Sequence, residues 1–269
     1  MTGRIRIGCQ GWNYPGWAGP LFPEGARPAD YLSLYARAFD TVEVDSTFYA
    51  APSERTVRGW VERAPEGFLF ALKLPREITA ERRLVGAEPV LEEFLDRARL
   101  LGPKLGPVLV QLGPDFSPAE RPALKRFLPV LPADLRFAVE FRQREWINRE
   151  THDLLAGHGV ALALNDGPWI PRRWLLQLAQ RPTADFHYVR WMGMNRELTD
   201  FSHVQLDRSE EITVWADALR GLPAQGLDVY GYVSNYFTGH SPATARELQQ
   251  RLGLPSVDPG SIGEQTSLF

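Results

Sequence analysis

The sequence is poor in the residues that build covalent cross-links and metal clusters. It contains 1 cysteine, Cys9, among 269 residues, which excludes an intramolecular disulfide and a multi-cysteine zinc or iron–sulfur site. The 5 histidines show neither HxH nor HExxH spacing, so a histidine-rich zinc cluster is not indicated. The sequence also lacks the GxSxG turn that presents a serine nucleophile in α/β-hydrolases.

Long hydrophobic runs and an excess of one charge are missing as well. No apolar run reaches the length of a membrane span, and the N-terminus lacks the hydrophobic core of a signal peptide. We therefore expect a cytoplasmic protein without a membrane partner. The formal net charge of −3 gives the whole molecule no basic footprint for nonspecific binding of nucleic acid, although a local basic patch remains compatible with it.

Hydrophobic residues, by contrast, are abundant enough for one large core. They make up 44% of the chain, and they include 8 Trp, 14 Phe and 8 Tyr. A chain of this length is normal for an α/β barrel built as a single unit. We expect one domain over residues 1–254, followed by a short flexible tail over residues 255–269.

Segments of strand and helix character alternate along the whole chain. Apolar or alternating runs of strand length occupy residues 4–10, 41–46, 68–75, 106–113, 136–141, 160–166, 185–191 and 228–235. Helical patterns occupy residues 28–39, 53–64, 88–102, 117–131, 149–159, 172–180, 209–222 and 242–253. This alternation predicts an α/β fold, specifically a (β/α)₈ TIM-like barrel. An open doubly wound sheet is the alternative, but the turn GCQGWNYPGW lacks its usual glycine spacing.

The second expected strand carries two acids on one face. In DTVEVDSTFYA, Val42 and Val44 alternate with Glu43 and Asp45, so both carboxylates point the same way. In a closed barrel that direction is the lumen, where uncompensated negative charge is costly. Cations from other strands should therefore converge on the same space.

Polar residues stand near the carboxyl end of every expected strand, where barrel enzymes place their active sites. We predict catalytic roles for Glu43, Lys73, Glu140 and Asp166. Carboxylates also suit a hard cation, so Glu43, Asp45, Glu140 and Asp166 are candidate ligands for Mg²⁺ or Mn²⁺. Expected substrate contacts are Gln10, Trp12, Tyr49, Gln111, Arg142, Arg190 and Asn235. The alternative is that these charges form structural ion pairs, such as Glu140 with Arg142.

Ordered sequence blocks carry a family resemblance over nearly the entire expected barrel. They are GCQGWNYPGWAGPLFP, FDTVEVDSTFYAAPS, GFLFALKLPREIT, LGPKLGPVLVQLGPDF, RFAVEFRQREW, ALALND, FHYVRWMG and GYVSNYFTGHSPATARELQQRL. Together they resemble the uncharacterised family called domain of unknown function 72. The resemblance implies a TIM-like barrel with a charged mouth formed by Glu43, Lys73, Gln111, Glu140, Arg142, Asp166 and Arg190, and it supplies no reaction. The chain departs from the family pattern at three places, with Asp45 for Asn, Ser234 for the first of two Asn, and Met192 for His.

The last residues form a second, shorter motif. Gln265, Ser267, Leu268 and Phe269 resemble the pentapeptide that binds the bacterial sliding clamp. An exposed flexible segment can place two apolar side chains in a pocket while a glutamine forms a hydrogen bond beside them. The alternative is that Leu268 and Phe269 fold back onto the barrel.

These features support three functional hypotheses. The first is an enzyme acting on a phosphorylated or nucleotide-like ligand, with DNA processing and metal-assisted phosphoester hydrolysis as its sharpest form. The second is a non-catalytic ligand-binding or adaptor barrel recruited to the sliding clamp. The third is a glycoside hydrolase that uses two of the same carboxylates, which the density of Lys and Arg disfavours.

Overall fold

The structure, a computed structural model, describes residues 2–194 and 197–263. Its strands are all parallel and form one sheet in the order β6-β5-β4-β3-β2-β1-β9-β8-β7. The strands are β1 (Ile5–Gln10), β2 (Thr41–Val44), β3 (Leu69–Lys73), β4 (Leu105–Gln111), β5 (Phe137–Glu140), β6 (Ala161–Leu162), β7 (Leu164–Asp166), β8 (Phe186–Trp191) and β9 (Asp228–Val233). The predicted TIM-like barrel is confirmed.

The sheet closes because its two terminal strands are consecutive in the chain. The sixth expected strand, over residues 160–166, is interrupted at Ala163 into β6 and β7. The first half pairs with β5 through Leu162, and the second half pairs with β8 through Leu164. Closure therefore needs no further strand, and the expected sixth strand is present as two short pieces.

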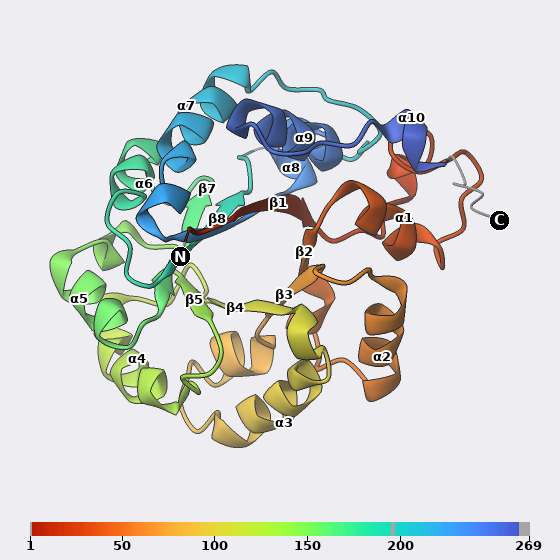
Figure 1. Ribbon diagram of the computed structural model, residues 1–269. Helices are drawn as coiled ribbons and strands as arrows, with labels where there is room; N and C mark the ends of the chain where they lie inside the picture. Colours follow the sequence, from red (N-terminus) through yellow and green to blue (C-terminus); the bar gives the residue numbers. More distant parts are fainter. Residues whose placement is uncertain (1, 195–196, 264–269) are drawn as a thin grey trace.

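Helices form a ring around the strands, as Figure 1 shows in a view along the barrel. They are α1 (Tyr31–Ala38), α2 (Glu54–Arg63), α3 (Glu88–Arg99), α4 (Arg121–Phe127), α5 (Arg149–Gly157), α6 (Arg172–Leu178), α7 (Ser209–Arg220), α8 (Asn235–Thr238), α9 (Ser241–Leu252) and α10 (Pro259–Ile262). Every predicted helical segment overlaps one of them. Across the described residues, none of these helices has the length and apolar character that crossing a membrane requires.

Small and large side chains share the interior of the barrel. Alanines such as Ala71 and Ala138 face the lumen and leave room for the buried rings of Tyr188 and Tyr232. At the N-terminal end, Arg136 donates to Asp228 (2.6 Å) and to Asp185 (2.7 Å). Inward residues of different sizes fill such a barrel as a packed core rather than a pore. Ligand chemistry is therefore confined to its two ends.

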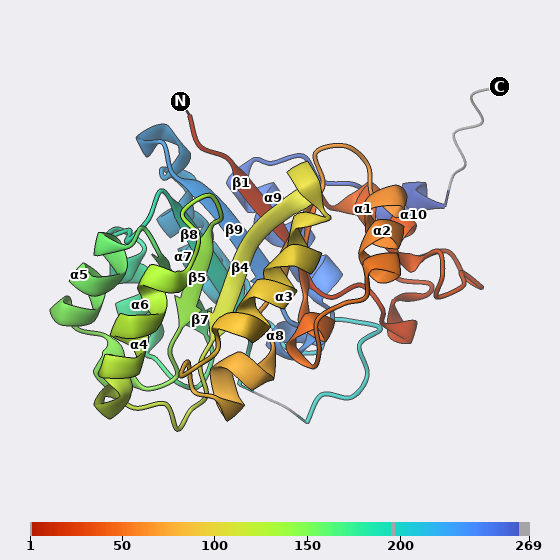
Figure 2. The same ribbon diagram turned by 90° about the horizontal axis from the view of Figure 1, so that it is seen from below.

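Part of the segment predicted as a tail packs against the barrel. Helix α10 lies beside α1, as Figure 2 shows from the side, and the side chain of Ile262 is 1% exposed. Arg37 of α1 donates to the carbonyl oxygen of Ile262 at 2.8 Å. The candidate clamp-binding residues Gln265, Ser267, Leu268 and Phe269 lie outside the described residues.

Candidate active site at the barrel mouth

Arg190 lies at the centre of the charged layer near the carboxyl ends of the strands. Its guanidinium binds both oxygens of Glu43, with Nε to Oε2 at 2.8 Å and Nη2 to Oε1 at 2.7 Å. On its other side, Nη1 donates to Glu140 Oε2 at 2.6 Å and to Gln111 Oε1 at 3.2 Å. Arg190, Glu43 and Glu140 are each 0% exposed. One cation therefore bridges two carboxylates that project from β2 and β5, with two strands between them.

Neighbouring side chains satisfy the remaining acceptors of Glu43. Gln10 donates from Nε2 to Oε1 at 2.9 Å, and the Tyr188 hydroxyl donates to Oε2 at 2.7 Å. A buried carboxylate is tolerated when its lone pairs are filled in this way. The position of Glu43 on the lumenal side of β2 follows from the alternation seen in the sequence.

The charges of this cluster hold Glu140 in its ionised form. Burial alone would raise the pKa of Glu140, but the neighbouring charges of Arg190 and Arg142 outweigh burial and lower it below its usual range. The two carboxylates in turn hold the pKa of Arg190 well above its ordinary value, against the opposing effect of burial. Glu140 is therefore poorly suited to act as a general acid, since that role needs a raised carboxyl pKa.

Lys73 and Asp45 form a second, looser pair at the rim. Lys73 Nζ lies 3.9 Å from Asp45 Oδ1 and 4.0 Å from the ring centroid of Phe48. Asp45 and Phe48 belong to one 3₁₀ turn, η2 (Asp45–Phe48), which is fixed to β3 because Lys73 N donates to Thr47 Oγ1 at 3.0 Å. The Lys73 side chain is 9% exposed and that of Asp45 is 36% exposed. Among the described residues this is the only ion pair of Lys73, and its Nζ donates no hydrogen bond.

The environments of these two groups shift their pKa values toward each other. Burial, together with the charge of Glu43, raises the pKa of Asp45 to about 6, although Lys73 and Arg190 oppose the shift. Burial and the charge of Arg190 lower the pKa of Lys73. Such displacement is typical of functional acid and base groups, although structural ion pairs also produce it.

The raised pKa of Asp45 predicts a pH-dependent effect of Asp45→Asn on stability. Because the folded state holds this proton more tightly, Asp45 favours folding below pH 4 and loses that contribution as the pH rises through about 6. We expect the variant to match the wild type at pH 4 and to exceed its free energy of unfolding by about 1 kcal/mol at pH 8, a modest value because solvent screens the side chain. Urea unfolding at both pH values measures this. A difference that is equal at both pH values would contradict it.

Arg142 extends the cationic surface of the mouth. Its Nε donates to Glu140 Oε1 at 3.2 Å, and its guanidinium carbon lies 5.5 Å from the ring centroid of Trp169. The predicted pair of Glu140 with Arg142 is therefore present. Its terminal nitrogens make no hydrogen bond within residues 2–194 and 197–263, and the side chain is 15% exposed. They are thus available to a ligand.

The structure does not bring Asp166 into this group. Asp166 pairs in register with Trp191, whose side chain faces the helices, whereas the preceding residue, Asn165, pairs with Arg190. Its carboxylate accepts from Arg172 Nε and from Trp215 Nε1, both at 2.7 Å. The predicted lumenal position of Asp166 is thus off by one residue, because side chains alternate between the two faces of a strand.

Trp12, Asn235 and Tyr49 also lie apart from the charged cluster. Trp12 packs edge-on against Trp60 of α2, with ring centroids 5.8 Å apart, so it lies between the barrel and a helix. The Oδ1 of Asn235, at the start of α8, accepts from Trp17 Nε1 at 3.2 Å. Tyr49 is 74% exposed beside Phe48. Of these three predicted contacts, Tyr49 alone follows directly on η2 at the rim.

The four carboxylates predicted to bind a metal do not assemble into a ligand set. The guanidinium of Arg190 lies between Glu43 and Glu140, and Asp166 faces the helices. Over the described ranges, no group of three or more His, Cys, Asp or Glu side chains is arranged to hold a metal ion. The correction follows from the cluster itself, because a protein cation occupies the place between the acids.

Asn165 is a residue of the mouth that the sequence analysis missed. It lies on the lumenal side of β7, is 2% exposed, and its Oδ1 is buried without a hydrogen-bond partner. An unpaired buried acceptor is costly unless a ligand or water completes it. The alternation of small and large residues in ALALND was the available signal, because Ala161, Ala163 and Asn165 share one face.

Fold and site together define a (β/α)₈ barrel whose mouth holds a buried carboxylate–guanidinium cluster below a lysine–aspartate pair. A model of the family described as protein of unknown function DUF72 matches residues 6–265, and the chain belongs to this family. The family resemblance predicted from the sequence blocks is confirmed.

Relatives of the chain are found in distant bacteria. The chain is 31% identical over 156 residues to UPF0759 protein YecE of Escherichia coli K12, a stretch that is 58% of this chain and 55% of that protein. It therefore spans about half the length of that relative. It is 25% identical over 271 residues to UPF0759 protein YunF of Bacillus subtilis, covering 93% of this chain and 95% of that protein.

Solved structures share the fold. A DUF72 family protein from Thermotoga maritima aligns with a TM-score of 0.78 at 24% identity, over 93% of this chain and 99% of that one. D-psicose 3-epimerase with D-tagatose, from Clostridium cellulolyticum, aligns with a TM-score of 0.52 at 13% identity, over 92% and 97% of the two chains. At these identities the similarity shows the barrel architecture alone.

Proposed function

We propose that the chain is an enzyme acting on a phosphorylated or nucleotide-like ligand at the mouth of the barrel. The observation that carries this proposal is the Lys73 ammonium, which is nearly buried yet donates no hydrogen bond among the described residues. Burial of a lysine without a hydrogen-bonded partner is unfavourable, and an anionic ligand would supply that partner. Arg142 offers further donors to the same anion.

In this proposal the two layers of the mouth have different tasks. Asp45 is the group that accepts or donates a proton at a reacting oxygen, because its pKa of about 6 is close to neutral pH and its carboxylate is partly exposed. Glu43 and Glu140 hold Arg190 in place and do not themselves transfer protons. The proposal uses no metal, since the carboxylates do not form a ligand set.

The glycoside hydrolase and the DNA-processing form of the first hypothesis fit the site less well. A glycoside hydrolase needs a carboxyl group with a raised pKa, which Asp45 could supply, and a second carboxylate free to act as nucleophile or base. Arg190 binds both Glu43 and Glu140, so neither is free for that second role. A large DNA footprint is disfavoured by the net charge of −3. A non-catalytic barrel remains the competing function, since it would bind the same ligand without converting it.

Calorimetry with ribose 5-phosphate, with ribose as the matched control, tests the proposal. We expect saturable binding of the phosphate ester and none of the neutral sugar, because Lys73 and Arg142 require an anion. Absence of binding would refute the phosphate site. Binding without release of inorganic phosphate or other conversion, tested over a panel of phosphate esters that includes nucleotides, would favour the non-catalytic barrel.

We further propose that the last residues bind the bacterial sliding clamp. The support is the sequence match of Gln265, Ser267, Leu268 and Phe269, which follows closely on α10. We expect deletion of residues 264–269 to lower clamp affinity at least about tenfold, since peptide anchors of this kind carry most of the binding energy. The clamp-binding pattern prefers Leu where this chain has Thr266, so Thr266→Leu should strengthen binding. Surface plasmon resonance on immobilised clamp measures both, and equal affinity of the full and shortened chains would end the proposal.

A further inference from the structure

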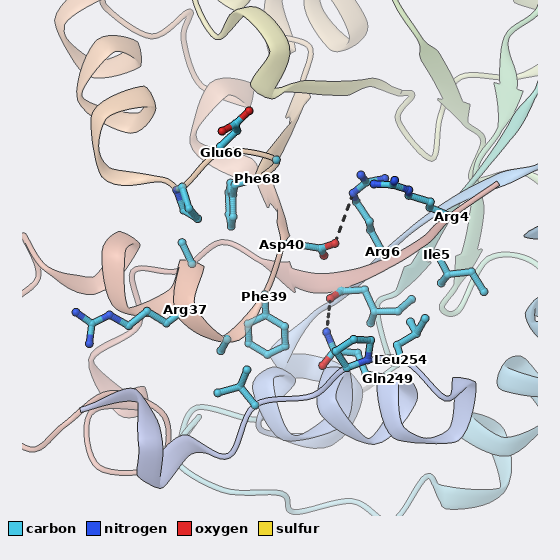
Figure 3. Close-up of a pocket in the computed structure, with 17 residues that line it drawn as sticks. Arg4, Ile5, Arg6, Arg37, Phe39, Asp40, Glu66, Phe68, Gln249 and Leu254 are labelled. Carbon is cyan, nitrogen blue, oxygen red and sulfur yellow. Dashed lines mark hydrogen bonds and ion pairs between the residues drawn. The ribbon is translucent and has the colours of Figure 1, made fainter. Parts of the chain in front are cut away.

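The polar groups at the N-terminal end of the barrel are divided between the two faces of β1. A cavity of about 420 Å³ lies there (Figure 3). Arg6 is on the lumenal face, with Nε 3.5 Å from Asp40 Oδ2. Gln249 of α9 is on the helix side and donates to the carbonyl oxygen of Ile7 at 3.2 Å. One ligand could not contact both groups, whereas the mouth holds a hydroxyl that is free to bind one.

This hydroxyl belongs to Tyr14, in the loop that follows β1. A Cβ atom at Gly11 would lie 3.2 Å from a ring carbon of Tyr14 and 3.5 Å from its hydroxyl oxygen. Gly11 comes directly after β1, and its backbone N donates to the carbonyl oxygen of Glu43 at 2.8 Å. The Tyr14 hydroxyl therefore lies at the carboxyl end of β1, where the mouth is.

Two aromatic neighbours hold the ring of Tyr14 in place. Its centroid lies 4.8 Å from that of Trp17 and 5.9 Å from that of Phe201, which meets it edge-on. A side chain held in this way loses little further conformational entropy when a ligand binds to it. The position of the hydroxyl is thus set before any ligand enters.

The Tyr14 hydroxyl lacks the partner that other tyrosines of the barrel have. Hydrogen bonds of 2.7 to 2.9 Å inside the protein engage the hydroxyls of Tyr35, Tyr188, Tyr230 and Tyr232. Tyr14 is partly buried, and its hydroxyl makes no hydrogen bond with the described residues. It is also not one of the polar atoms that these residues enclose without a partner. Since a phenol in an apolar setting normally finds a partner, this one can bind a ligand.

The hydroxyl shares its surroundings with Asp45. Burial raises the pKa of Tyr14, and the charge of Asp45 is the next largest cause of the shift, ahead of the charge of Glu43. The phenol therefore stays protonated at neutral pH and can donate a hydrogen bond. Tyr14 and Asp45 form no hydrogen bond with each other, so both are free to bind the same ligand group.

A hydroxyl group of the ligand suits this pair. It can accept a hydrogen bond from Tyr14 and donate one to Asp45 at the same time, whereas the carboxylate would repel a phosphate oxygen. We propose that Tyr14 and Asp45 bind a hydroxyl group of the ligand while Lys73 and Arg142 hold its phosphate. The assignment rests on the proposed function and narrows its substrates to phosphate esters that carry a free hydroxyl group.

Calorimetry with glycerol 3-phosphate and n-propyl phosphate tests the assignment, because these two esters differ only in their hydroxyl groups. We expect the wild type to bind glycerol 3-phosphate about tenfold more tightly, and Tyr14→Phe to reduce this preference about fivefold. The affinity of the variant for propyl phosphate should stay unchanged. Equal binding of the two esters by the wild type, or a preference that Tyr14→Phe leaves intact, would overturn the assignment.

The same titration separates this assignment from the phosphate site on which it rests. If the wild type bound neither ester, the proposed function would fail and the assignment of Tyr14 with it. If the wild type bound both esters equally, the phosphate site would stand and only the assignment of Tyr14 would fall.

Tyr35→Phe is the matched control for Tyr14→Phe. The Tyr35 hydroxyl donates to the carbonyl oxygen of Thr41 at 2.9 Å and accepts from Cys9 N at 2.7 Å. Its removal should lower the urea midpoint of unfolding and leave the preference between the esters unchanged. Tyr14→Phe should leave the midpoint unchanged, because its hydroxyl has no partner among the described residues. A lower midpoint in Tyr14→Phe would show that the hydroxyl is structural and would overturn the proposal.

Discussion

Replacing Arg190 by Gln should destabilise the protein by about 3–5 kcal/mol at pH 7, the cost of leaving buried carboxylates without their cation. Glu43 and Glu140 are both 0% exposed, and Arg190 is the charged partner that they share. Urea unfolding followed by tryptophan fluorescence measures the loss. The triple variant Glu43→Gln, Glu140→Gln, Arg190→Met should recover most of it, because removing a whole buried charge cluster is often nearly neutral.

The stability of Arg190→Gln should depend on pH in a direction that simple loss of packing would not produce. In the wild type the lowered pKa of Glu140 contributes stability above its ordinary value of 4.5, and this contribution is lost as the pH falls. In Arg190→Gln, loss of the Arg190 charge leaves burial to raise the pKa of Glu140, so the variant should gain stability between pH 7 and pH 5. A variant that instead loses stability over this range would contradict the account.

Arg136→Gln is the matched control for Arg190→Gln. Arg136 binds Asp228 and Asp185 at the opposite end of the lumen, but its side chain is 36% exposed. Water can solvate the carboxylates that it leaves, so we expect a loss of about 1 kcal/mol. Equal losses of stability in the two variants would mean that burial of the Arg190 cluster does not increase the cost of removing its cation.

The barrel could be predicted from the sequence because its signals are local and repeated. Each strand can be recognised in the sequence by alternation or an apolar run, and each helix by its hydrophobic period. Because the strand–helix unit occurs eight times, the fold class is well determined. The convergence of Glu43, Lys73, Glu140 and Arg190 followed from barrel closure alone. Which of them pair could not be predicted, since pairing depends on strand stagger and side-chain reach.

Two of the residues misplaced by the sequence analysis, Asp166 and Asn235, share one physical cause. Asp166 and Asn235 were chosen because they are the last polar residues of their strands. Whether a side chain points into the lumen, however, depends on its place in the alternation that starts from residues inside the strand. Counting from Tyr230 and Tyr232 makes Ser234 the inward residue, and counting from Ala161 selects Asn165. Trp12 was misplaced differently, because it follows Gly11, whose φ of 75° turns the chain outward.

Lys73→Met should lower the affinity for ribose 5-phosphate by about 10- to 100-fold, the range expected for loss of a charge-assisted hydrogen bond. The stability should not fall with it. Burial lowers the pKa of Lys73, which means that the fold disfavours its charge, and methionine of similar length fills the same space. Calorimetry and urea unfolding on the same preparation measure the two quantities.

Lys104→Met provides the contrast that separates function from structure. Lys104 Nζ donates to the carbonyl oxygens of Val61 (2.7 Å) and Ala64 (2.6 Å) at the end of α2, far from the strand ends that form the mouth. Its replacement should cost about 2 kcal/mol of stability, because it leaves those carbonyls without a charged donor, and it should not alter phosphate-ester affinity. Replacing a residue that serves ligand binding should lower the affinity and leave the stability unchanged. Replacing a structural residue should lower the stability and leave the affinity unchanged. If Lys73→Met instead behaved like Lys104→Met, the buried ammonium would be a structural group and the mouth would need another anion-binding residue.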